Sequence, residues 1–116
     1  MRKTLSCVLL FPAIVSCASD PAPDEQIRLT EQALTQARSA GASEQTEELA
    51  QAEKKLAAAM VAMKDKDYRE ARLQAEQAEL DARLAEARVL SEKSHLEVAE
   101  LNRRIARLRE QLGAMQ

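Results

Sequence analysis

The amino-acid sequence predicts an all-α protein, a three-helix antiparallel bundle whose long third helix extends as a coiled-coil arm. Three observations support this fold class. After position 23 the chain has no proline, and its only glycines are Gly41 and Gly113, while helix-forming residues dominate. Charged side chains make up 31% of the sequence and aromatic side chains only 2%, which is typical of long helices. A heptad pattern of apolar residues then follows in the last part of the chain.

The first expected helix runs from about Asp24 to Ala40. Asp24 supplies an acidic group at the N-terminus, and Gly41 gives the C-terminal stop. Its apolar stripe recurs at helical spacing and consists of Ile27, Thr30, Leu34 and Ala37.

The second and third expected helices are separated by a turn at Lys66. The second starts at about Ser43 or Glu44 and ends at Lys64, with a stripe made of Leu49, Ala52, Leu56, Ala59 and Met63. The third starts at Asp67, because Glu70 follows three residues later in capping-box spacing, and it continues to about Leu112.

The third helix carries two apolar stripes on opposite sides. The first, which we call the seam, follows heptad spacing through Leu80, Leu84, Ala87, Ser91, Ser94, Val98, Leu101, Ile105, Leu108, Leu112 and Met115. The second, which we call the alanine face, stops near residue 89 and consists of Ala71, Ala75, Ala78, Ala82, Ala85 and Val89. Folded back at Lys66, the second helix would reach about as far as the alanine face does, since each residue adds ~1.5 Å. We therefore expect Tyr68 and the alanines to pack a hairpin, with the first helix beside it.

The seam predicts pairing with another helix, either in a homo-oligomer or with a partner protein. Branched residues alternating with leucine between Val98 and Leu112 favour a parallel dimer. Against this, Arg104 would face Arg109 of the other chain in a parallel dimer, and Ser91 and Ser94 weaken the middle of the seam. The orientation and the oligomeric state therefore stay open.

The N-terminus has the three parts of a bacterial lipoprotein signal. Arg2 and Lys3 form the basic start, residues 5–15 are mostly apolar, and Ser16 precedes Cys17. A cysteine directly after a small residue resembles the lipobox, in which the cysteine receives lipid and becomes the new N-terminus. The competing interpretation is an uncleaved anchor, but the apolar run is shorter than the ~20 residues of a membrane-spanning helix.

Cleavage before Cys17 would change the charge and the thiol content of the chain. Arg2 and Lys3 would be lost, so that 15 basic residues face 19 acidic ones, a formal charge of −4. Cys7 would also leave, so no disulfide is expected. Membrane attachment would come from the lipid, and an acidic chain gives no reason to expect nucleic-acid binding. Because Ala18 is not aspartate, the resemblance implies an outer-membrane protein facing the periplasm, the inner membrane being the alternative.

These signals divide the chain into four expected segments. They are a signal peptide at 1–16, a lipidated cysteine with a flexible tether at 17–23, a helical bundle at 24–90, and a coiled-coil arm at 91–116. Neither a cofactor nor a metal is expected, because His95 is the only histidine and has no second ligand beside it. We also expect no catalytic residue, since the acidic groups are spread over helix surfaces.

The stretch from Asp67 to Ala87 resembles a bacterial lipoprotein family known as domain of unknown function 4398. The preceding Lys55-Leu56 and the segment Leu29-Thr30-Glu31-Gln32-Ala33 fit the same family. Relatives occur as small lipoproteins or fused to peptidoglycan-binding domains similar to that of outer-membrane protein A. The resemblance implies an envelope location and no established activity, and a cell-wall-associated partner becomes conceivable.

Two functions follow as hypotheses. In the first, the chain is a non-enzymatic, lipid-anchored periplasmic protein that acts as a helical spacer, scaffold or interaction module through the seam. In the second, it is an accessory subunit that binds a periplasmic enzyme or secretion component through the helical hairpin, with the alanine face and Tyr68 as contacts.

Overall fold

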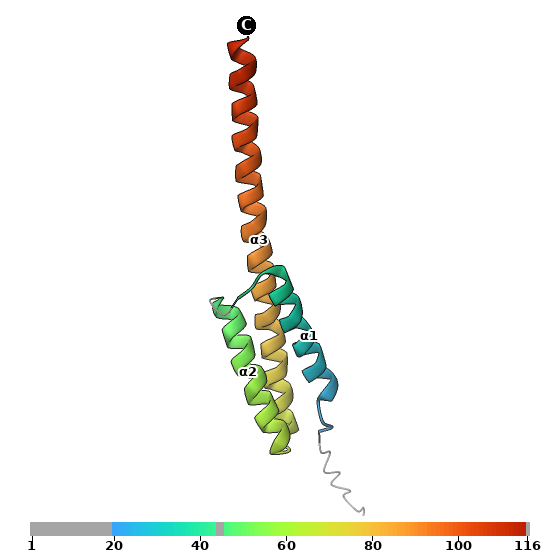
Figure 1. Ribbon diagram of the computed structural model, residues 1–116. Coiled ribbons are helices and arrows are strands. Elements are labelled where there is room, and N and C mark those ends of the chain that lie inside the picture. The colour runs from blue at the N-terminus through green and yellow to red at the C-terminus, as the bar shows by residue number, and fades with distance from the viewer. Residues whose placement is uncertain (1–19, 44–45, 116) are drawn as a thin grey trace, which may run out of the picture.

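The computed structural model describes residues 20–43 and 46–115. Within these ranges it consists of three helices, α1 (Asp24–Ala40), α2 (Glu47–Lys64) and α3 (Tyr68–Ala114), and it has no strand. α1 and α2 lie beside the first half of α3, which continues alone far beyond them (Figure 1). The predicted all-α bundle with a long third helix is thereby confirmed. None of the three helices is both long enough and apolar enough to cross a membrane.

α2 and α3 form an antiparallel hairpin, and two ion pairs between them give its alignment. Near the open end of the hairpin Glu48 pairs with Arg88. Closer to the turn, Lys55 Nζ lies 2.6 Å from Asp81 Oδ2. Arg88 is exposed and the other three side chains are partly buried, so these pairs indicate the alignment of the two helices and add little stability.

α1 runs parallel to α3 and lies beside the hairpin. Near its start Ile27 belongs to the same buried cluster as Ala75, and at its end the ammonium group of Lys93 donates to the carbonyl oxygen of Ala40. Ile27 is one turn into α1 whereas Ala75 is two turns into α3, so α1 begins about one turn above the start of α3.

α1 and α2 both end in a residue with positive φ. At α1 this residue is Gly41, with φ of 114°, and the following Ala42 N–H donates to Ala37 O at 3.0 Å. At α2 it is Lys66, with φ of 61°, and Asp67 N–H donates to Ala62 O at 2.9 Å. These bonds satisfy carbonyl groups that the end of a helix leaves free. The chain then reverses direction directly after Lys66.

The starts of the helices follow the sequence signals to different degrees. α3 begins as expected, because the Asp67 carboxylate accepts from the backbone N–H of Glu70 at 3.2 Å. α2 begins at Glu47, whereas a start at Ser43 or Glu44 was expected. Ser43 N–H donates to the Thr46 hydroxyl at 3.1 Å, and Thr46 N–H donates to Ser43 O at 2.8 Å. This local turn keeps Ser43 out of the helix, and Glu44 lies outside the described residues.

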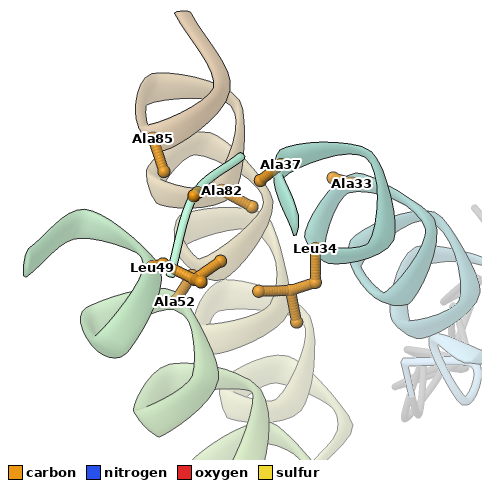
Figure 2. Packing of buried hydrophobic residues seen from close by; sticks show 8 residues of the cluster. Ala33, Leu34, Ala37, Leu49, Ala52, Ala82 and Ala85 are labelled. Atoms are coloured by element: carbon orange, nitrogen blue, oxygen red, sulfur yellow. The ribbon is translucent and has the colours of Figure 1, made fainter. Parts of the chain in front are cut away.

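The core of the bundle is built mainly from alanine. Leu34 and Leu49 point toward the alanines of all three helices in the upper half of the bundle (Figure 2). The predicted stripe of α1 is buried throughout, and in α2 Leu56 and Met63 are half-buried while Leu49, Ala52 and Ala59 are buried. The stripes omitted Ala33 and Ala62, which are buried too. Small side chains let the helix axes approach closely, because no long side chain separates them.

Thr30 is the one polar side chain buried in the core of the described residues. Its hydroxyl lies 2.9 Å from Gln26 O in its own helix and 2.9 Å from Ala75 O in α3. A hydroxyl has a single proton to donate, so it serves these two acceptors in alternation or shares the proton. The polar group is therefore satisfied inside the alanine core and links α1 to α3.

Candidate functional site: the seam of α3

The seam predicted from heptad spacing lies on the side of α3 that no other helix covers. Its seven large residues are all exposed, with exposed fractions from 45% for Ile105 to 66% for Leu80; they are Leu80, Leu84, Val98, Leu101, Ile105, Leu108 and Leu112. Met115 continues the line and is 76% exposed. A folded monomer rarely leaves such a continuous apolar line open to water, so the seam is the main candidate for a binding surface.

The alanine face lies on the opposite side of the same helix and is filled by α1 and α2. Ala71, Ala75, Ala78, Ala82 and Ala85 have no exposed surface at all. Tyr68 is half-buried at the first position of α3, beside the turn. The idea that a partner protein binds the alanine face is therefore wrong, because that face is already occupied within the chain.

The seam starts earlier than the heptad count from Leu80 suggested. Leu73 precedes Leu80 by seven residues and is 46% exposed, so it belongs to the same line. The spacing alone would have identified it, but the polar Gln77 between the two leucines hid the continuation. Two further exposed leucines lie off the seam: Leu90 flanks it, whereas Leu96 lies on the opposite side of the helix, in line with Val89.

The charge of the arm becomes positive toward its C-terminal end. Glu100 is ion-paired within the helix, at 3.4 Å from Arg103, 3.0 Å from Arg104 and 3.5 Å from Arg107. From residue 102 to residue 115 the arm has four arginines and one glutamate. The end of the arm is therefore basic, whereas the whole chain has a formal charge of −2.

Glu79 forms one of the polar links between α1 and α3. Gln26 Nε2 donates to Glu79 Oε2 at 2.6 Å, and Arg83 Nε donates to Glu79 Oε1 at 2.9 Å. The hydrogen bond from Gln26, followed by the one from Arg83, lowers the pKa of the Glu79 carboxyl below its usual value of 4.5. This carboxylate therefore bonds α1 to α3 within the bundle.

The remaining residues singled out from the sequence do not form a site in the part of the chain that the structure describes. His95 is exposed on the arm. No group of three or more histidine, cysteine, aspartate or glutamate side chains comes together there in a way that could hold a metal ion. Cys17, the expected lipidation site, lies outside the described residues.

The comparisons with known proteins agree with this architecture. The sequence model of domain of unknown function 4398 (DUF4398) matches residues 25–101. The chain belongs to the DUF4398 family. A crystal structure of a DUF4398 family protein from Pseudomonas aeruginosa PAO1 is 55% identical in sequence, with a TM-score of 0.80. This match covers 83% of the chain and 100% of that structure. No curated protein matches the chain.

The arm is part of what this DUF4398 protein shares with its relatives. The family match ends at residue 101, ten residues beyond Ser91, where the free part of α3 begins. The match to the crystal structure covers 83% of the chain, which is more than residues 1–90 could supply. Both comparisons therefore extend past the bundle into the arm.

Proposed function

We propose that this DUF4398 protein is a non-enzymatic, lipid-anchored envelope protein whose bundle holds out a helical arm, and that the arm binds another helix through the seam. The observation that supports this proposal is the contrast between the two sides of α3. All five small residues of the alanine face are fully buried, whereas the large residues of the seam are exposed. Burying one large apolar side chain contributes about 1.5–3 kcal/mol, so covering the seam is strongly favourable.

The shape of the seam supports a helix as the partner. Apolar residues occupy two positions per heptad between Val98 and Met115, which is the narrow pattern that knobs-into-holes packing requires. Such a surface suits a spacer or scaffold, which needs a long rigid element with a specific contact at the end. It does not suit a small substrate, because a single exposed helix encloses nothing.

The anchor supports an envelope location. The basic start, the apolar run and the Ser16-Cys17 pair are the sequence features of a lipoprotein signal. The described chain starts at Asp20, at the end of the bundle opposite to the C-terminus (Figure 1). With lipid on Cys17, three residues before Asp20, the arm would point away from the membrane. Ala18 favours the outer membrane, with the protein facing the periplasm.

The anchor is tested with Cys17→Ala in the full chain. We expect loss of lipid labelling and release of the protein from the membrane fraction, because none of the described helices can cross a membrane. The matched control is Cys7→Ala, which removes the other thiol and leaves the lipobox intact. Retention of the Cys17→Ala protein in the outer-membrane fraction would contradict lipid anchoring.

The seam is tested with Leu101→Glu/Leu108→Glu, which places two charges on it. We expect at least a tenfold loss of chemically crosslinked complexes in intact envelopes, because each buried charge would lack a partner. The matched control is Leu96→Glu/Ala106→Glu, which changes exposed residues of the arm that do not belong to the seam. Both proteins should keep the helical signal of the bundle. Equal loss in both variants would point to general charge effects and would reject the seam as the contact.

A further inference from the structure

We propose that the partner helix is the arm of a second copy of this chain, paired antiparallel over residues 98–115. This inference rests on the proposed function and makes it more specific. In a two-fold symmetric contact, residue i of one copy meets residue j of the other, and residue j meets residue i. We therefore compare the possible alignments of two copies and ask which one places an apolar residue opposite each apolar residue of the seam.

One antiparallel alignment pairs all six apolar seam residues of the free arm with one another. Val98 meets Met115, Leu101 meets Leu112, and Ile105 meets Leu108. The two residue numbers in each pair add to 213, so the two-fold axis passes between residues 106 and 107. Each side chain in these pairs is 45% exposed or more in the single chain, so all of them are available.

The charges beside the seam favour the same alignment. In heptad terms, Asn102 and Arg109 flank one side of the seam, and Arg104 and Gln111 flank the other. With the axis between residues 106 and 107, Arg104 of one copy faces Gln111 of the other, and Arg109 faces Asn102. No like charges meet, and each arginine faces an amide that can accept a hydrogen bond.

The other possible alignments each bring two arginines together. In a parallel dimer Arg104 faces Arg109 of the second copy. Shifting the antiparallel pair by one heptad toward the bundle sets Arg104 against Arg104 and places Leu112 opposite Ser94. Shifting it one heptad the other way sets Arg109 against Arg109 and loses a pair of layers. Like charges directly opposite each other in a dimer are destabilising, so these alignments are disfavoured.

The bundles do not obstruct this pairing. The paired stretch begins at Val98, five residues beyond Lys93, which contacts Ala40 at the top of the bundle. The bundle of each copy also lies on the alanine side of α3, away from the seam. Ser91 and Ser94 fall outside the paired stretch, which explains how a seam can contain them without placing them opposite apolar residues.

Antiparallel pairing changes what a spacer built from this chain can do. The two bundles lie at opposite ends of a rod, with the starts of the two α3 helices about 115 Å apart at 1.5 Å per residue. Each end carries its own N-terminus. Such a dimer suits a bridge between two anchoring surfaces, or a rod lying along one surface, and does not suit a stalk rising from a single anchor point.

Disulfide formation between single-cysteine variants tests the alignment. Cys7 and Cys17 of the full chain are replaced by serine, and Leu101→Cys and Leu112→Cys are prepared as separate proteins on this background. After mixing and mild oxidation, we expect a disulfide between Cys at 101 and Cys at 112, with at least tenfold less dimer from either protein alone. A control pair, Leu96→Cys mixed with Leu112→Cys, lies off the seam at one position and should stay unlinked.

The alternative outcomes are distinct. Strong self-linking of Leu101→Cys alone would show parallel pairing and overturn the antiparallel alignment, although the seam would remain the contact. A monomer at every concentration tested, without disulfides in any mixture, would overturn the second copy as the occupant. The proposed function is judged separately, by the crosslinks that Leu101→Glu/Leu108→Glu loses in intact envelopes.

Discussion

The two halves of α3 have similar local sequences and opposite surroundings. In residues 68–90 the five alanines of the alanine face are buried and the leucines point outward, whereas in residues 91–115 the whole circumference is exposed apart from Glu100, which is half-buried. Both halves are rich in helix-forming residues and intrahelical ion pairs such as Glu79–Arg83 and Glu100–Arg104. What separates them is the presence of neighbouring helices, and this depends on α1 and α2 alone.

The comparison shows where the chain places its large apolar residues. Leu34 and Leu49 are the only buried leucines among the described residues, while ten large apolar residues of α3 are exposed. An alanine core removes little apolar surface per residue, so close approach of the backbones must provide much of the stability of the bundle. The large apolar side chains of the seam could contribute more hydrophobic stabilisation than the alanines, but only when another helix covers them.

The largest difference between the halves should appear when a leucine is truncated in each. Leu49→Ala should lower the free energy of unfolding by about 3 kcal/mol, because Leu49 is 1% exposed and its removal leaves a cavity among alanines that cannot expand. Leu101→Ala makes the same change on the arm and should cost less than about 0.5 kcal/mol in the monomer. Urea unfolding of the full chain, followed by circular dichroism at low protein concentration, measures both.

The same two variants can also disprove the claim that the bundle half of α3 is packed and the arm is not. Equal destabilisation by Leu49→Ala and Leu101→Ala would show that the arm is packed in the free protein and that its seam is not available. A loss confined to Leu101→Ala at high protein concentration would instead show that association stabilises the arm, as the self-pairing proposal requires.

The sequence predicted the parts of the fold that local chemistry determines. The bounds of α1 followed from Asp24 and from Gly41, whose positive φ is a conformation that glycine adopts readily. The two stripes of α3 followed from periodicity, and the limited length of α2 explained why the alanine stripe stops near Val89. Each of these features depends on a few neighbouring residues.

Other features depend on interactions that the sequence does not reveal. The late start of α2 at Glu47 results from hydrogen bonds between Ser43 and Thr46, which compete with helix formation. The offset of α1 by one turn depends on how Ile27 and Thr30 fit between the alanines. For the candidate site, periodicity gave the seam but not Leu73, since the polar Gln77 interrupts the line.

The smallest expected difference concerns the acidic residues of the two halves. Glu79→Gln should lower the free energy of unfolding by about 1 kcal/mol at pH 7, because the carboxylate joins α1 to α3 through Gln26. Glu100→Gln should change it by less than about 0.5 kcal/mol, because the three arginines around Glu100 belong to the same exposed helix.

Since the folded-state pKa of Glu79 lies below 4.5, its stabilisation is fully present above that pH and disappears as the pH falls through the folded value. Unfolding curves at pH 7 and pH 3 should therefore show a gap between wild type and Glu79→Gln that narrows in acid. A gap of equal size at pH 3 would assign the effect to altered packing of Gln26 and not to the carboxylate charge.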